Sequence, residues 1–451
     1  MIERLALFGA TGDLAGRFLF PALAALFAGG HLPDGFSVMG AATQDLDDEA
    51  FRRGVSEKLA DHASDVPAAA RRTLLRSLRY RAVDIDDPTS VASLLEGATA
   101  PVAAYLALPP GLFPVAVGSL GRAGLSAGSR IVLEKPFGED LAGATALNRL
   151  LAQVAGDEGE HAIFRVDHVL GMGTTQNLVA LRRSGVLDPL WHGTHVGQVE
   201  ILWEETLGLE GRAGYYDGAG ALKDVLQNHM LQLLCLVAME PSSNADEQGM
   251  RKRKVDVLRS IRAPSAEQPL RSRRARYDAG RLAATGGASG AVVPAYVDEN
   301  GVDAARSTET FVELTLEVET DRWRGTPFVL RAGKALSQRR KGVLIRFRSR
   351  DGETPNELWI GIDGPSDIVL RLTGGGVGRP EEVELRGAPR IADLPAYAYV
   401  LLDVLTGGSH LSVGADEAEE AWHVVTPILE SWRANQVPME EYAAGSEGPR
   451  R

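Results

Sequence analysis

The chain has 451 residues, of which 44% are hydrophobic and 24% charged, and this composition excludes a disordered or fibrous protein and suits two folded domains. Its 48 Lys and Arg stand against 60 Asp and Glu, and the net charge of −12 argues against nucleic acid as the main partner. No stretch approaches the roughly 20 uninterrupted apolar residues of a membrane helix, so we expect a soluble protein with no membrane partner.

The single cysteine, Cys235, excludes an intramolecular disulfide and a thiolate metal cluster. The first residues lead from a short apolar run directly into a glycine-rich turn, without the pattern of a signal peptide. Both features fit a reducing compartment. The sequence therefore predicts a cytoplasmic protein with no metal site.

The first part of the chain alternates short apolar runs with helical patterns. We expect strands at residues 5–8, 36–39, 103–108 and 131–133, and helices at 14–27, 50–59 and 141–154. This β-α-β alternation predicts a parallel sheet that is covered by helices on both faces. We assign residues 1–170 to this α/β domain.

The pattern of predicted elements changes near residue 195, where strand-like runs become longer and helices become fewer. We expect strands at 196–203, 310–318, 327–330, 343–347, 357–362 and 368–372, and helices at 220–239 and 415–432. The pattern predicts an α+β domain with a large, mainly antiparallel sheet over residues 171–451.

A glycine-rich turn, GATGDLA at residues 9–15, follows the first strand and opens a helix. Glycines let backbone amides approach a pyrophosphate, and a helix N-terminus favours its charge, so the turn predicts dinucleotide binding. The second strand leads into Thr43, Gln44 and Asp45, with no arginine for the 2′-phosphate of NADP. This favours NAD, unless Arg17 or another base reaches the phosphate of NADP.

Two later segments carry groups suited to acid–base chemistry: RVDH at residues 165–168 and YYDGAGALKDVLQNH at 215–229. His229 has Val225, Leu226 and Leu233 at helical spacing, so it lies beside the apolar stripe of its helix. On spacing alone, a buried structural histidine and a catalytic base both remain open.

Seven blocks together resemble the glucose-6-phosphate dehydrogenase family over nearly the whole chain. They are GATGDLA (9–15), YLALPP (105–110), EKPFG (134–138), RVDH (165–168), the run 215–229, STETF (307–311) and LRAGKAL (330–336). The resemblance implies a Rossmann domain followed by a large-sheet domain, a homodimer or homotetramer, and a role in carbohydrate metabolism. It also implies oxidation of C1 of a hexopyranose to a lactone by hydride transfer to NAD or NADP.

The resemblance assigns roles to individual residues. His229 would be the catalytic base, Asp167 would orient it, and Lys135 would lie between sugar and cofactor. A histidine suits this role because its pKa lies near the working pH. The substrate-binding set would comprise His168, Glu205, Asp224, Lys334, Asp363 and Arg339. The cofactor-binding set would comprise Gly9, Thr11, Gly12, Asp13, Leu14, Thr43, Leu108, Pro109 and Lys135.

The chain departs from the family pattern near the expected phosphate site. After Asp-His the family continues as Tyr-Leu-Gly-Lys, but this chain has Val169 and Met172 in place of the tyrosine and the lysine. Losing a charged donor to a phosphate costs about 1.5–3 kcal/mol per hydrogen bond. Asp363 stands where the family usually has a glutamine near the sugar.

Three interpretations follow from these departures. The chain oxidises D-glucose 6-phosphate to 6-phosphogluconolactone with relocated phosphate ligands, for which Arg339 and Arg340 are candidates. Alternatively, it is a paralogue that performs the same chemistry on an unphosphorylated or amino-substituted sugar. The third interpretation is an inactive sugar- or nucleotide-binding regulatory protein on the same scaffold.

Overall fold

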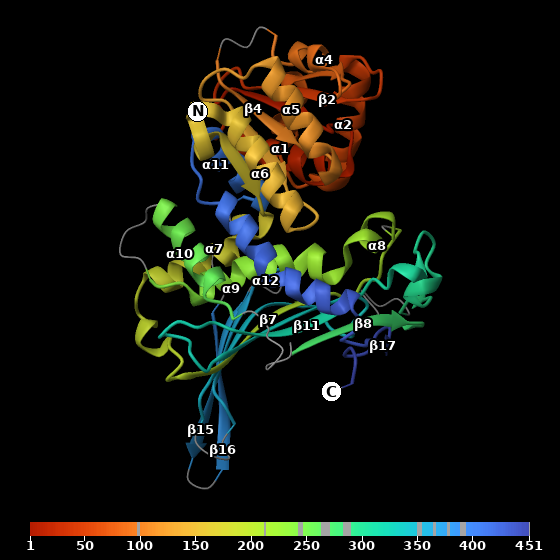
Figure 1. The fold of residues 1–451 in the computed structure, drawn as a ribbon. Coiled ribbons are helices and arrows are strands. Elements are labelled where there is room, and N and C mark those ends of the chain that lie inside the picture. Colours follow the sequence, from red (N-terminus) through yellow and green to blue (C-terminus); the bar gives the residue numbers. More distant parts are fainter. Residues whose placement is uncertain are drawn as a thin grey trace. The chain divides into compact units, whose positions relative to one another are not determined.

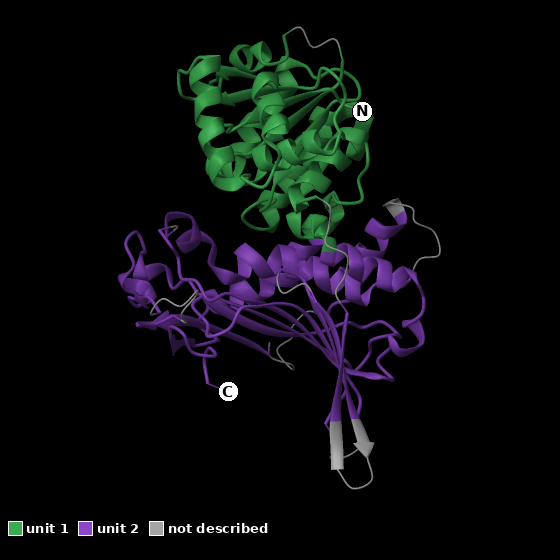
Figure 2. Cartoon of the chain, turned by 180° about the vertical axis from the view of Figure 1, so that it is seen from behind, with its two compact units in different colours: residues 1–173, 391–419 green, residues 174–390, 420–451 purple. Residues whose placement is uncertain are grey.

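The computed structural model describes residues 1–96, 100–211, 213–241, 247–262, 271–282, 290–349, 354–363, 367–376, 379–387 and 394–450 (Figure 1). The chain divides into two compact units, which Figure 2 colours separately. Unit 1 comprises residues 1–173 and 391–419, and unit 2 comprises residues 174–390 and 420–451. Within the described residues, no helix combines the length and the apolar character needed to cross a membrane.

Unit 1 is built on a parallel sheet whose strand order is β3-β2-β1-β4-β5-β6. Its strands are β1 (Arg4–Phe8), β2 (Ser37–Ala42), β3 (Leu78–Ala82), β4 (Val102–Leu106), β5 (Arg130–Glu134) and β6 (Ile163–Val166). Every residue of β4, β5 and β6 is buried, as expected for strands covered on both faces. The predicted parallel α/β architecture is confirmed.

Helices separate these strands along the chain. They are η1 (Ala15–Leu19), α1 (Phe20–Ala28), α2 (Asp48–His62), α3 (Ala68–Ser77), α4 (Pro88–Ser93), η2 (Pro110–Leu112), α5 (Phe113–Ala123), α6 (Leu141–Ala155), η3 (Gly156–Ala162) and η4 (His168–Gly171). A later segment returns to this unit and forms α11 (Ala396–Thr406), which packs on α1 and η4. The sequence pattern did not predict a helix at this place.

The expected helix at 14–27 is divided into two parts. Its first turn, η1, is a π turn in which the N–H of Phe20 donates to the carbonyl of Ala15. The next residue is Pro21, which has no N–H to donate, and α1 continues from there with the proline in its first turn.

Unit 2 contains a larger sheet with the order β16-β15-β14-β13-β7-β12-β11-β8-β17 among the described residues (Figure 1). Its strands are β7 (Val196–Glu204), β8 (Ser272–Asp278), β11 (Phe311–Glu317), β12 (Pro327–Gly333), β13 (Arg340–Phe347), β14 (Glu357–Gly361), β15 (Ile368–Gly376), β16 (Arg379–Gly387) and β17 (Met439–Ala443). Neighbouring strands are antiparallel except for the pairs β7–β12 and β8–β17. The predicted large, mainly antiparallel sheet is confirmed.

The remaining elements of the second half include a small ladder and several helices. The ladder joins β9 (Gly280–Arg281) to β10 (Val292–Val293). The helices are α7 (Gly173–Arg183), η5 (Asp188–Leu190), α8 (Ala213–Ala221), η6 (Leu222–Met230), α9 (Leu231–Ala238), α10 (Glu247–Arg259), η7 (Tyr296–Asp298), η8 (Ala304–Arg306) and α12 (Ala415–Arg433). Helix η6 packs on β7 and β12, so it covers one face at the middle of the large sheet.

The helix expected at 220–239 is also divided. Its first residue, Gly220, lies inside α8 with a non-helical φ of 70°, and the residues that follow form two parts, the π-helical η6 and then α9. A Cβ at Gly220 would lie 2.5 Å from a carboxylate oxygen of Glu309. The close approach of this distant side chain is the reason for the glycine.

Candidate active site

The glycine-rich turn lies at the carboxyl end of β1. Gly9 has a φ of 75°, and a Cβ there would lie 2.1 Å from the carbonyl oxygen of Ala107. The N–H of Gly12 closes the turn on the carbonyl of Gly9 at 2.9 Å, while Thr11, Gly12 and Asp13 are exposed. Exposed backbone at the start of a helix is the arrangement that accepts a pyrophosphate.

The other expected cofactor residues follow neighbouring strands of the same sheet. Thr43 follows β2, Leu108 and Pro109 follow β4, and Lys135 follows β5. The strand order reverses between β1 and β4, and ligands of open parallel sheets bind at the carboxyl ends of the strands near such a reversal. The residues present therefore fit a dinucleotide.

The loop after β2 is held from two sides. Thr11 Oγ1 donates to Gln44 Oε1 at 2.5 Å, and the hydroxyl of Tyr80 donates to the carbonyl of Gln44 at 2.7 Å. Arg17, the base considered for a 2′-phosphate, pairs with Asp13 at 3.5 Å.

A buried group of polar side chains lies beside Lys135 in unit 1. The hydroxyl of Tyr105 donates to Glu134, and the hydroxyl of Tyr397 lies 3.5 Å from the other carboxylate oxygen. Burial raises the pKa of Glu134 to about 7, although the hydrogen bond from Tyr105 and the charge of Lys135 both lower it. The side chain at the start of the Glu-Lys-Pro block is thus half protonated near neutral pH.

Tyr397 also connects this group to the RVDH segment. Its ring stacks on that of His168, with centroids 5.6 Å apart and 21° between the planes. Asp167, which is fully buried, accepts a hydrogen bond from the N–H of Val169 at 3.1 Å and so begins η4. Tyr397 was not a predicted site residue, because α11 lies far along the chain from the RVDH segment and no motif marks it.

The sugar-binding candidates of unit 2 gather at the end of β7. Trp203 is paired with Lys341 across β7 and β13, and Glu204 with Arg340. Because side chains alternate along a strand, Trp203 and Glu205 belong to one face of the sheet and Glu204 to the other.

Glu205 is held by two lysines. Its Oε2 pairs with Lys334 Nζ at 2.7 Å and its Oε1 with Lys341 Nζ at 2.9 Å. Burial alone would raise the pKa of Glu205, but the charges and hydrogen bonds of Lys334 and Lys341 outweigh it and lower the pKa to about 2. Glu205 is therefore a carboxylate throughout the physiological range.

Asp363 extends this group in the same unit. It pairs with Lys341 at 3.2 Å and with Arg339 at 2.8 Å. Burial raises the pKa of Asp363, but the charges of Lys341 and Arg339 prevail and lower it below the usual range.

Lys341 was not a predicted site residue. Its position opposite Trp203, two residues before Glu205, could have revealed it had the strand pairing been known.

His229 lies in η6 with 3% of its surface exposed. Its ring packs against that of Trp203, with centroids 5.2 Å apart, and Lys341 Nζ lies 4.7 Å from the centre of the same tryptophan. Trp203 thus joins His229 to the carboxylate group around Glu205. Asp224, on the same helix, lies 3.5 Å from the hydroxyl of Tyr215.

The structure brings together some of the predicted residues and divides others between the units. Glu205, Lys334, Asp363 and Arg339 form one connected group in unit 2 with His229 beside it. Lys135, Asp167 and His168 belong to unit 1 together with the cofactor set.

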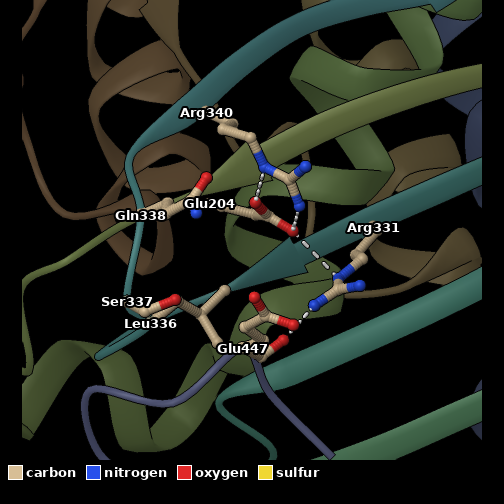
Figure 3. Close-up of a pocket in the computed structure, with 7 residues that line it drawn as sticks. All are labelled: Glu204, Arg331, Leu336, Ser337, Gln338, Arg340 and Glu447. Carbon is tan, nitrogen blue, oxygen red and sulfur yellow. Dashed lines mark hydrogen bonds and ion pairs between the residues drawn. The ribbon is translucent and has the colours of Figure 1, made fainter. Parts of the chain in front are cut away.

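The opposite face of β7 carries a separate charged group (Figure 3). Glu204, which is 2% exposed, pairs with Arg340 at 2.6 Å and with Arg331 at 2.9 Å. These side chains line a pocket of about 110 Å³ together with Leu336, Ser337, Gln338 and Glu447. Glu204 and Glu205, which are adjacent in the sequence, therefore belong to two different charged groups.

Comparison with known proteins identifies the family. Residues 6–177 match the model "Glucose-6-phosphate dehydrogenase, NAD binding domain", and residues 179–451 match "Glucose-6-phosphate dehydrogenase, C-terminal domain". The chain belongs to the glucose-6-phosphate dehydrogenase family. Membership confirms the resemblance and makes the chain an oxidoreductase with a nicotinamide dinucleotide-binding domain.

Individual members of the family match over nearly their whole length. Glucose-6-phosphate 1-dehydrogenase of Mycolicibacterium smegmatis is 36% identical over 98% of this chain and 93% of its own. The crystal structure of the Mycobacterium avium enzyme has a TM-score of 0.84 and 30% identity, covering 100% of this chain and 96% of that one. A glucose-6-phosphate dehydrogenase in complex with its substrate glucose 6-phosphate has a TM-score of 0.86 and 29% identity, covering 99% and 95%.

Proposed function

We propose that this member of the glucose-6-phosphate dehydrogenase family oxidises D-glucose 6-phosphate at C1 to 6-phosphogluconolactone. The observation that carries the proposal is the group of Glu205, Lys334, Asp363 and Arg339 beside His229. It combines an ionised acceptor for sugar hydroxyls, several cations for an anionic substrate and a buried imidazole. The relatives named glucose-6-phosphate 1-dehydrogenase support the same reaction.

In this proposal His229 removes the proton from the C1 hydroxyl as the hydride leaves C1. A buried imidazole held against Trp203 has few orientations, which favours proton transfer in one direction. Asp167 is proposed to orient the imidazole and to stabilise the imidazolium, as the family resemblance implies. Lys135, next to the buried Glu134, is proposed to contact sugar and cofactor.

The sugar would be held mainly by charged side chains. Glu205 would accept hydrogen bonds from sugar hydroxyls, and because its pKa is about 2 it would accept them at any physiological pH. Asp224 would bind further hydroxyls, and Lys334 and Arg339 would donate to the sugar and its phosphate. His168, stacked on Tyr397, is proposed as a phosphate ligand.

The cofactor would be held by the turn from Gly9 to Leu14, by Thr43 and by the loop of Leu108 and Pro109, with Lys135 near its reactive end. When bound, the nicotinamide would supply the acceptor for the hydride that leaves C1. We propose NAD as the preferred form, since Gln44 and Asp45 follow Thr43 and the loop carries no arginine. Arg17, already paired with Asp13, is a poor substitute.

The departures at Val169 and Met172 favour a second candidate, the same oxidation of an unphosphorylated or amino-substituted sugar. Val169 is fully buried, and neither side chain can donate to a phosphate. An amino sugar would need a carboxylate to receive its ammonium group. Asp363 is a weak candidate for that role because Lys341 and Arg339 already pair with it.

The test is NAD(P)H formation at 340 nm by the purified protein. NAD and NADP would each be combined with glucose 6-phosphate, glucose, glucosamine 6-phosphate and glucosamine. Turnover of glucose 6-phosphate with the highest kcat/KM supports the proposal. A higher kcat/KM on an unphosphorylated sugar overturns it in favour of the second candidate, and no turnover of any sugar would favour an inactive binding protein.

We also propose that the enzyme works in the cytoplasm as a homodimer or homotetramer. A reducing compartment suits a chain whose one cysteine, Cys235, is buried. Sedimentation of the purified protein would give the oligomeric state directly.

A further inference from the structure

Lys341 occupies a central place among the charged side chains at the end of β7. It is 9% exposed, and its ammonium group contacts Glu205 Oε1 at 2.9 Å and Asp363 Oδ2 at 3.2 Å. The same nitrogen lies over the ring of Trp203, which in turn packs against His229. One lysine thus touches two sugar-binding candidates and the aromatic neighbour of the proposed base.

The contacts of Lys341 are additional to pairs that are already complete. Glu205 has Lys334 at 2.7 Å, and Asp363 has Arg339 at 2.8 Å. Each carboxylate would therefore keep one cation if Lys341 were neutral. The local role of Lys341 is then to add charge and to link two ion pairs into one connected group.

The connected group contains three cations, Lys334, Lys341 and Arg339, and two carboxylates, Glu205 and Asp363. It carries one net positive charge, and this excess comes from Lys341, because the other four residues form two neutral pairs. Exposure increases along the group, from side chains of Lys341 and Lys334 that are about one tenth exposed to an Arg339 side chain that is 52% exposed. A positive excess at this position attracts an anionic substrate over a neutral one.

We propose that Lys341 is a specificity-determining residue, whose charge gives this sugar site its preference for a phosphorylated over an unphosphorylated hexose. The inference rests on the proposed function and deepens it. It explains how a phosphorylated sugar could be selected although Val169 and Met172 provide no donor. In this arrangement Asp363 moderates the positive charge and is not itself a ligand for an amino group.

The test is a series of variants in which the charge of the group changes in steps. Lys341→Met makes the group neutral, Asp363→Asn raises its charge to two, and the double variant Lys341→Met with Asp363→Asn restores one. Lys341→Arg keeps the charge on a side chain that is one atom longer. The matched control is Lys252→Met, which removes an exposed lysine on α10 that pairs with Asp256.

The quantity to measure is the ratio of kcat/KM for glucose 6-phosphate to that for glucose. Both values come from one sample, so a variant that folds incompletely does not change the ratio. We expect the ratio to change roughly tenfold for each unit of charge, as for charges several Å apart near a protein surface. Lys341→Met should lie lowest and Asp363→Asn highest, while the double variant, Lys341→Arg and Lys252→Met should stay near the parent.

Failure of this inference and failure of the proposed function give different results. If the parent prefers glucose 6-phosphate and the ratio is the same in Lys341→Met, the function stands and the inference is overturned. A double variant that keeps the low ratio of Lys341→Met would also overturn it, since packing and not charge would then be responsible. If the parent does not turn over glucose 6-phosphate, the proposed function fails, and the assignment of the charge to a phosphate fails with it.

Discussion

Glu309 accepts a hydrogen bond from the backbone N–H of Leu222 at 2.9 Å, across 87 residues of sequence. Leu222 is the first residue of η6, the helix that carries Asp224 and His229, so a buried carboxyl group caps the N-terminus of that helix. The carbonyl oxygen of Glu309 also accepts from the N–H of Ala221 at 3.2 Å. One residue therefore defines where the helix of the proposed base begins.

This relationship predicts that the Glu309 side chain stabilises unit 2. Glu309→Ala should lower the free energy of unfolding by about 1–2 kcal/mol, because the N–H of Leu222 loses its acceptor in a buried place. Glu309→Gln keeps an acceptor and should lose less. Urea unfolding of both variants measures the difference. Equal losses in the two variants would contradict a capping role.

The assignment of His229 as the base predicts a loss confined to the chemical step. His229→Asn should lower kcat by roughly 10²–10⁴-fold, the usual contribution of a general base. Binding of the dinucleotide should change little, because the residues proposed to bind the cofactor belong to unit 1. Steady-state kinetics and cofactor titration check both points, with exposed His62→Asn as the control. Unchanged turnover in His229→Asn would remove His229 from the mechanism.

The fold could be predicted from the sequence because its strands are short apolar runs with regular spacing. The runs at 103–108 and 131–133, for example, became the fully buried strands β4 and β5. The helix predicted at 220–239 begins at the break at Gly220, but the sequence did not reveal that it is divided into η6 and α9. Nor did it reveal the approach of Glu309 to Gly220, which is a tertiary contact with no local signal.

The candidate site was predicted mainly from sequence motifs, and some residues that contact the predicted site residues lie outside these motifs. Glu205, Lys334, Asp363 and Arg339 were named from the resemblance, and the structure joins them in one group. Lys341 was missed because its importance follows from strand register. The roles of all the site residues stay predictions.

The buried carboxyl group of Glu134 predicts a pH-dependent stability. Its pKa is raised from 4.5 to about 7, so the folded protein binds this proton more tightly than the unfolded chain does. The free energy of unfolding therefore falls as pH rises from about 4.5 to about 7, by about 3 kcal/mol from this group. Glu134→Gln should remove this part of the decline.

Thermal or urea unfolding at pH 5 and pH 8 measures this decline in the parent and the variant. Burial also raises the pKa of Glu309 to about 7. The variant Glu134→Gln should therefore keep the part of the decline that comes from Glu309 and lose the part that comes from Glu134. The exposed Glu49→Gln serves as the control. A decline of the same size in Glu134→Gln and in the parent would show that Glu134 ionises normally in the folded protein.

The loop after β2 predicts how cofactor preference can be changed. Thr43 is the first residue after β2, and Thr43→Arg would place a guanidinium where the 2′-phosphate of NADP is expected. New charge-assisted hydrogen bonds of about 1.5–3 kcal/mol should tighten NADP binding roughly tenfold to hundredfold, and leave NAD binding nearly unchanged. Titration of each dinucleotide against the intrinsic protein fluorescence measures both dissociation constants.

The control is Thr406→Arg, at the exposed end of α11. It adds the same charge to unit 1 away from the loop and should alter neither constant. If Thr406→Arg improves NADP binding as much as Thr43→Arg does, the gain comes from net charge, and the loop after β2 does not read the phosphate.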